Sequence, residues 1–387
     1  MGLPSCKSVH AGHSYGQDRR HDPRKAADKR HGQQFGLYRR LTGRLILAAI
    51  VLATSLVPLS ADPLRLAFWN VELNRRGPGL LLRDIARGED AQVAAVVTVL
   101  AKLNADVLVL TGVDYDLGLA ALNALSDELG KAGAQYPVLF AAAPNAGVTT
   151  GFDLDGDGRR GGPRDAMGYG RFAGEGGVAL LSRLPIDSTA VRDFSGFLWR
   201  DLPGNLMPSD TPPDIAAVQR LSSNVHWDVP ITLAGGRTLH LMIWHATPPV
   251  FDGPEDRNGR RNHDEAGFWL ALIDGMLPIA PPKGSFVLIG QPNMDPDRGD
   301  GLPAAMRRLL IHPKLQDPAP AGAMGTATAD FSARNGPGAL RSDVILPSQD
   351  LDVTASGVMW PLPDDPMLPV LQAASRHRPI WIDIDLP

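Results

Sequence analysis

Leu64-Arg-Leu-Ala-Phe-Trp-Asn-Val-Glu72 begins as a short apolar run and ends in polar residues, and Asp106-Val-Leu-Val-Leu-Thr-Gly-Val-Asp114 repeats this pattern. Apolar runs of this length are typical of buried strands. Between them, Asp90–Leu103 has the apolar spacing of an amphipathic helix. Two strands separated by a helix, with polar residues after each strand, predict an α/β domain whose loops carry a site.

The same alternation continues to the end of the chain. Further strands are predicted at Gly177–Ser182, Leu239–His245, Phe286–Ile289, Asp343–Leu346 and Ile380–Ile384, and further helices at Gly118–Leu129, His263–Asp274 and Leu302–Ile311. No internal repeat and no linker interrupts them. Residues 62–387 are therefore expected to form one domain.

Composition excludes several classes of protein. Of the 387 residues 44% are hydrophobic, which excludes a wholly disordered chain. Cys6 is the one cysteine, so neither a disulfide framework nor a cysteine-based zinc site can form. No clean apolar run of eighteen residues occurs after the leader, which excludes a protein with several membrane spans.

Residues 1–61 have the pattern of an export signal. A long basic segment ends in Arg44, the apolar run 45–57 follows, and small residues lead to Ala61. This order is typical of a cleaved secretory signal peptide, and an uncleaved membrane anchor over 45–61 is the alternative. We therefore expect a secreted or periplasmic protein.

Charge is divided unevenly along the chain. Residues 1–61 hold ten of the 38 Lys and Arg residues and three of the 42 acidic ones, which leaves 28 basic and 39 acidic residues in the body. Long nucleic acids are bound largely through Lys and Arg on phosphates. The acidic body therefore favours a small or lipid-linked ligand; no protein partner can be inferred, and a monomer is expected.

Polar motifs follow the predicted strands in a recognisable order. They are Trp69-Asn70-Val71-Glu72, Thr111-Gly112-Val113-Asp114, Gly176-Gly177-Val178-Ala179-Leu180-Leu181-Ser182-Arg183, Trp244-His245-Ala246-Thr247, Gly290-Gln291-Pro292-Asn293, Arg341-Ser342-Asp343-Val344-Ile345-Leu346 and Ser375-Arg376-His377. Together they resemble the endonuclease/exonuclease/phosphatase superfamily, the DNase I-like metal-dependent hydrolases. The resemblance spans about 64–385. It implies a four-layer α/β sandwich, in which two packed, mostly antiparallel β-sheets are flanked by helices.

The resemblance also implies roles for individual residues. His377 would activate water or contact the phosphate, while His245 and Asn293 would hold the phosphoryl group. Asn70 would bind the metal, Mg²⁺ or Mn²⁺, since both ions prefer oxygen ligands. Asp343 is expected to supply a carboxylate to the His377 network. A histidine at a strand end is otherwise a satisfied structural residue, and that alternative stays open for both histidines.

Three positions depart from the family pattern. Gly112 replaces a glutamate metal ligand, Gln291 replaces an aspartate, and Arg376 replaces the aspartate before the last histidine. Asp114 lies two residues after Gly112 and is expected to substitute as the metal ligand, because side-chain direction repeats every two residues in a strand. Asp116 and Glu72 are weaker alternatives. Arg376 cannot orient an imidazole by accepting its proton.

Two loops carry further candidate sites. Asp153, Asp155 and Asp157, with Asp165 beyond, have the spacing of a calcium loop, and a solvated acidic turn is the alternative. Arg257 and Arg260 follow His245 closely enough to clamp a phosphate, and a surface salt-bridge loop is the alternative.

The favoured function is an exported, divalent-metal-dependent phosphoester hydrolase of the phosphodiesterase, phosphatase or nuclease type, in which His377 assists water attack on phosphorus. The alternative is a catalytically weakened or inactive binding protein on the same fold, and Gly112, Gln291 and Arg376 favour it. A third possibility is a protein held together by Ca²⁺ whose function lies elsewhere.

Overall fold

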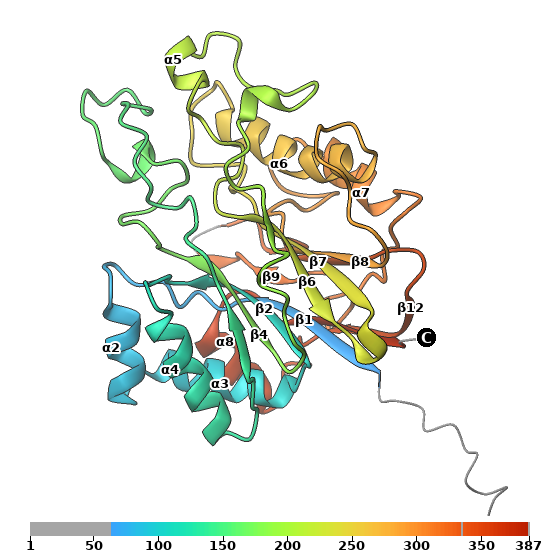
Figure 1. The fold of residues 1–387 in the computed structure, drawn as a ribbon. Helices are drawn as coiled ribbons and strands as arrows, with labels where there is room; N and C mark the ends of the chain where they lie inside the picture. The colour runs from blue at the N-terminus through green and yellow to red at the C-terminus, as the bar shows by residue number, and fades with distance from the viewer. Residues whose placement is uncertain (1–62, 334–335, 386–387) are drawn as a thin grey trace, which may run out of the picture. The chain divides into compact units, whose positions relative to one another are not determined.

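The computed structural model describes residues 63–333 and 336–385, which contain two large β-sheets (Figure 1). The leader predicted over 1–61 lies outside the described residues. In the first sheet the strand order is β12 (Asp352–Val358), β13 (Ile380–Asp385), β1 (Leu64–Asn70), β2 (Val107–Val113), β4 (Gly177–Ser182) and β3 (Val138–Phe140). Strands β1 and β2 are parallel, and the other pairs in this sheet are antiparallel.

The second sheet has the order β11 (Val344–Pro347), β8 (Phe286–Gln291), β7 (Thr238–His245), β6 (His226–Thr232) and β5 (Arg192–Asp193). Only β7 and β8 are parallel in it. A separate short hairpin joins β9 (Ala329–Asp330) to β10 (Ala339–Leu340).

Three hydrophobic cores separate four layers. Leu66 and Phe68 of β1 face the second sheet and pack in a core with Trp227, Ile243 and Ile289. Ala67 and Trp69, on the opposite face of the same strand, pack against helices. This alternation follows from the two-residue period of a strand, and it buries both faces of the sheet.

Helices cover the outer face of each sheet. The first sheet is covered by α2 (Leu80–Arg87), α3 (Ala91–Leu103), α4 (Ala120–Lys131) and α8 (Met367–Ala374), and the second by α6 (Arg257–Ile273) and α7 (Ala304–Leu310). Helix α5 (Pro213–Ala216) is a single turn. The predicted four-layer sandwich is confirmed. Within the described residues, no helix is both long enough and apolar enough to cross a membrane.

The predicted elements are present with small changes at their ends. Strand β8 runs two residues further than expected, to Gln291, and α6 begins at Arg257 rather than near His263. The elements that were not predicted are strands β3, β5, β6, β9, β10 and β12 and helices α2, α5 and α8. In β6 the buried residues Asp228 and Pro230 interrupt the apolar run, and a buried aspartate is uncommon unless it is paired.

Candidate functional site

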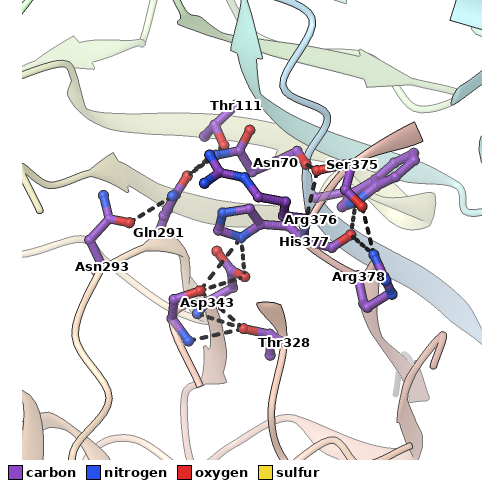
Figure 2. Close-up of polar contacts among 12 residues, drawn as sticks. Asn70, Thr111, Gln291, Asn293, Thr328, Asp343, Ser375, Arg376, His377 and Arg378 are labelled. Carbon is purple, nitrogen blue, oxygen red and sulfur yellow. Dashed lines mark hydrogen bonds and ion pairs between the residues drawn. The ribbon is translucent and has the colours of Figure 1, made fainter. Parts of the chain in front are cut away.

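The site forms where two pairs of parallel strands end. Asn70 of β1 lies beside Thr111 of β2, and His245 of β7 lies beside Gln291 of β8. Parallel strands bring their carboxyl ends to one edge of a sheet, so residues distant in sequence meet there. Figure 2 shows the polar contacts that result.

Gln291 is the centre of an amide network that joins the two sheets. Its side-chain oxygen accepts hydrogen bonds from Asn70 Nδ2 (2.8 Å) and from the Thr111 hydroxyl (2.9 Å). Its amide nitrogen donates to Asn293 Oδ1 at 2.8 Å, and Asn293 Nδ2 donates to the Ala246 carbonyl at 2.7 Å. All these groups are neutral. The network therefore satisfies each amide without an ion.

Gly112 leaves no room for a side chain at the position of the expected glutamate. Its φ is +73°, and a Cβ would lie 2.5 Å from Asn70 Oδ1 and 2.9 Å from the Glu72 backbone nitrogen. That nitrogen donates to Asn70 Oδ1 at 3.0 Å. Backbone therefore holds Asn70 Oδ1, the oxygen that would face a metal.

Glu72 and Arg376 form an ion pair beside the network. Arg376 Nε donates to Glu72 Oε1 at 2.8 Å, and the Arg376 backbone nitrogen donates to Glu72 Oε2 at 2.7 Å. The Ser375 hydroxyl also reaches Oε2, at 3.1 Å. Burial alone would raise the pKa of Glu72. The hydrogen bonds from Arg376 and the charge of the nearby His377 outweigh burial, so this pKa lies below its ordinary value.

Asp114 takes no part in the amide network. Its two carboxylate oxygens accept the backbone N–H groups of Arg75 (2.8 Å) and Gly176 (2.9 Å). Burial raises the pKa of this carboxyl despite those two bonds. The structure gives Asp114 the role of a loop clamp, and its role as a metal ligand stays a prediction.

His377 and Asp343 form a buried pair. His377 Nδ1 lies 2.9 Å from Asp343 Oδ2, and both side chains are almost fully buried. The expected contact between them is present, and it leaves Nε2 as the ring nitrogen available to a ligand or a water molecule. The other carboxylate oxygen, Asp343 Oδ1, is buried and has no hydrogen-bond partner among the described residues.

His245 lies close to this pair and is held neutral. Burial, together with the charge of His377, lowers the pKa of His245 to about 4. The residue as a whole is half-buried, yet its Nδ1 atom is enclosed and has no hydrogen-bond partner in the described part of the chain. A buried polar atom without a partner is costly.

The two arginines after His245 contact other protein groups, and their role as a phosphate clamp stays a prediction. Arg257 donates to Gln219 Oε1 at 2.7 Å and to the Leu154 carbonyl, and Arg260 donates to the Glu255 carbonyl at 3.1 Å. Both side chains therefore hold loops. The adjacent Arg261 is buried and donates to four backbone carbonyls.

The acidic loop brings three of its four predicted residues together. Carboxylate oxygens of Asp153, Asp155 and Asp165 lie within 4.8 Å of one another. Asp157 is outside this group and accepts the Arg159 backbone N–H at 2.8 Å. Its place in the predicted calcium set is therefore not supported. Calcium binding by the other three stays a prediction.

Several site residues were not predicted. Thr111 follows an apolar strand without any distinguishing motif, although its register beside Asn70 places it at the same strand ends. Ser375 donates to the Asn70 carbonyl at 2.7 Å and accepts the His377 backbone N–H at 3.0 Å. The polar run Ser375-Arg376-His377 drew attention to Ser375 in the sequence. Its contact with Asn70 is visible only in the structure.

Comparison with known proteins gives the family. The sequence matches the model of the Endonuclease/Exonuclease/phosphatase family over residues 67–377. The chain belongs to this family. No curated protein matches its sequence. Among solved structures, an endonuclease/exonuclease/phosphatase from Beutenbergia cavernae has a TM-score of 0.51 at 17% identity, with 84% of this chain and 72% of that chain covered.

Two further solved structures are similar. The family protein from Leptotrichia buccalis gives a TM-score of 0.48 at 17% identity, covering 84% of this chain and 100% of that one. Sphingomyelinase C from Streptomyces griseocarneus gives 0.45 at 17% identity, with 84% and 99% covered.

The residues present do not fit the divalent metal that the family resemblance implies. Hard ions such as Mg²⁺ need carboxylate oxygens. Gly112 and Gln291 supply none, and Glu72 is paired with Arg376. Asn70 Oδ1 accepts a backbone N–H, so even the retained asparagine is engaged. His245, Asn293 and His377, for which the resemblance implies contact with phosphate, are present, and that role stays a prediction.

Proposed function

We propose that this endonuclease/exonuclease/phosphatase family protein binds a phosphoryl group at His245, Asn293 and His377 without a divalent cation. The observation that carries the proposal is the neutral amide network around Gln291, which occupies the place of the expected metal ligands. The contact of His377 Nδ1 with Asp343 leaves Nε2 for a ligand, which supports binding at the same place. The geometry thus favours the second of the two functions expected from the sequence, a binding protein on a hydrolase fold.

The ligand that we propose is a small or lipid-linked phosphoester. The acidic body of the chain lacks the excess of basic residues that long nucleic acids require. We also propose that the protein is exported, with cleavage after Ala61, because residues 1–61 have the signal-peptide pattern. Edman sequencing of the secreted protein tests the cleavage site.

Metal-dependent hydrolysis is the second candidate function, and the His377–Asp343 pair is the observation that favours it. An imidazole oriented by a carboxylate is a common general base for water. The His377–Asp343 pair would suffice to take a proton from the attacking water. The residues at the family's metal positions argue against this function, because Gly112 and Gln291 carry no carboxylate and Glu72 is paired with Arg376.

One experiment separates the two functions. Inorganic phosphate is titrated calorimetrically into the protein in chelator, and turnover of a generic phosphodiester and a generic phosphomonoester is measured in Mg²⁺, in Mn²⁺ and in chelator. We expect phosphate binding in chelator, at least tenfold weaker in His377→Ala, and no turnover. Metal-dependent turnover that His377→Ala abolishes would establish the hydrolase instead.

Gln291→Asp is the second variant to be assayed. It restores the family's aspartate, but Gly112 still provides no ligand and no space for one, so we expect no turnover in Mg²⁺ or Mn²⁺. Metal-dependent activity in this variant would show a weakened enzyme rather than a binding protein.

A further inference from the structure

We infer that the guanidinium of Arg376 supplies the positive charge that binds the phosphoryl group, and that Glu72 competes with the ligand for it. This inference rests on the proposed function. Arg376 takes the place of the cation, and its ion pair with Glu72 limits the affinity for the phosphoryl group.

The position of Arg376 supports the inference. It directly precedes His377, and both residues contact the same aromatic ring: the Phe331 ring centroid lies 5.6 Å from that of the His377 imidazole and 5.5 Å from Arg376 Cζ. Its partner Glu72 lies two residues after Asn70 and donates its backbone N–H to the Asn70 side chain. The guanidinium is therefore held by Glu72, a residue that also contacts Asn70 of the amide network.

Arg376 is an exposed cation next to His377, whereas His377 itself is buried against Asp343. His245 is held neutral, because burial lowers its pKa to about 4. Arg378 is directed away, since its Nη1 donates to the Ser375 carbonyl at 2.6 Å and to the His377 carbonyl at 3.0 Å. The Arg376 side chain, by contrast, is 61% exposed and can turn toward a ligand. A planar guanidinium matches two oxygens of a phosphate.

Glu72 is placed as the competing anion. One of its oxygens, Oε1, receives the guanidinium, while Oε2 accepts from the Arg376 backbone N–H. The Oε2 bond keeps Glu72 in place when the guanidinium leaves Oε1. The Arg376 end of the pair is exposed to solvent, which weakens the attraction, so a dianionic phosphate can displace Oε1. Glu72 has a φ of +48°, an unusual backbone conformation for a residue other than glycine, and such strain is concentrated at functional sites.

Calorimetric titration of inorganic phosphate and phenyl phosphate, in chelator, tests this inference with three variants. Arg376→Gln removes the charge, and we expect about tenfold to hundredfold weaker binding, the range of a charge-assisted hydrogen bond. Arg376→Lys keeps the charge but loses the planar fork, so an intermediate affinity is expected. Glu72→Gln keeps an acceptor and removes the charge, and binding should tighten at least fivefold.

Matched controls come from exposed ion pairs elsewhere. Arg83→Gln breaks a pair with Asp84 on α2, and Glu128→Gln breaks a pair with Lys131 on α4. Neither should change phosphate affinity. Circular dichroism of each variant verifies that it is folded.

The outcomes distinguish this inference from the proposed function. Wild-type binding that neither Arg376→Gln nor Glu72→Gln alters would overturn the role of Arg376 and leave the proposed function standing. If the wild-type protein binds no phosphate but Glu72→Gln does, the competition by Glu72 is established and the wild-type function is not phosphate binding. If neither protein binds, both proposals fail.

Discussion

At the scale of single residues, Gly112 decides what the site can hold. A glycine there permits a φ of +73° and lets Asn70 and Glu72 approach to within a hydrogen bond. Any side chain would strike Asn70 Oδ1 and the Glu72 backbone. The backbone conformation at Gly112 therefore excludes the family's glutamate, and a single substitution at this position does not restore the metal ligand.

Gly112→Ala should destabilise the protein and weaken phosphate binding. The cost combines left-handed strain with a steric overlap at 2.5 Å, and we expect a loss of about 2–4 kcal/mol in the free energy of unfolding. Gly79→Ala is the matched control, because Gly79 has a φ of +76° and nothing lies within 4 Å of its Cβ position. It should cost about 1 kcal/mol, from the strain alone. Equal losses in urea denaturation of the two variants would contradict the steric argument.

At the scale of elements, helix α6 positions the loop that follows His245. Glu265 on this helix is fully buried and accepts three hydrogen bonds, from the Ser223 backbone (2.6 Å), the Ser223 hydroxyl (2.8 Å) and the Thr247 backbone (2.7 Å). Arg261, one turn earlier, holds carbonyls of the segment before β6. Helix α6 thus holds the segment before β6 and the residues after β7. These contacts determine the direction of the chain after His245.

Glu265→Gln should lower stability in a pH-dependent way. Burial raises the pKa of Glu265 to about 7, above the value of about 4.5 expected in the unfolded chain. Between these values the native state binds a proton that the unfolded state has released, so this group's contribution to stability is greatest in acid and is lost as the pH rises through 7. Glutamine cannot titrate. The stability difference between wild type and variant should therefore decrease from pH 5 to pH 8, by up to about 3 kcal/mol.

Urea denaturation at pH 5, 6, 7 and 8 checks this expectation. Burial also lowers the pKa of both His226 and His245 to about 4, which gives the opposite slope between pH 4 and 6.5. These two histidines are common to both proteins, so their effect cancels in the difference. A difference that stays constant across the four pH values would contradict the raised pKa of Glu265.

At the scale of the whole molecule, the question is whether an ion bound by Asp153, Asp155 and Asp165 stabilises the native state. An ion that binds only the folded protein raises its melting temperature. If the predicted Ca²⁺ site exists, millimolar Ca²⁺ should raise the Tm by several degrees over chelator, and Asp155→Asn should abolish the increase. Asp157→Asn should retain it, because Asp157 lies outside the carboxylate cluster. Equal Tm values in Ca²⁺ and chelator would support the solvated acidic turn.

The sequence by itself predicted most of the architecture. Apolar runs and amphipathic spacing depend on local periodicity, so β1, β2, β4, β7 and α3 were found close to their true bounds. Strand β6 was missed because Asp228 is paired across strands with Arg192 and His240, and such pairing cannot be read from the run itself. The sequence also identified the three departures from the family pattern and the partnership of Asp343 with His377.

The tertiary structure alone decided what those departures do. Register placed Thr111 and Gln291 against Asn70, and these contacts span up to 221 residues of sequence. The tertiary structure also gave Asp114 two backbone partners and paired Arg376 with Glu72. Arg257 donates to a glutamine side chain in it, and Arg260 donates to a backbone carbonyl. Residue types and their order are local properties that a sequence carries. The partner of a polar side chain is set by which strand ends and loops the packed sheets bring together, and no local pattern contains that information.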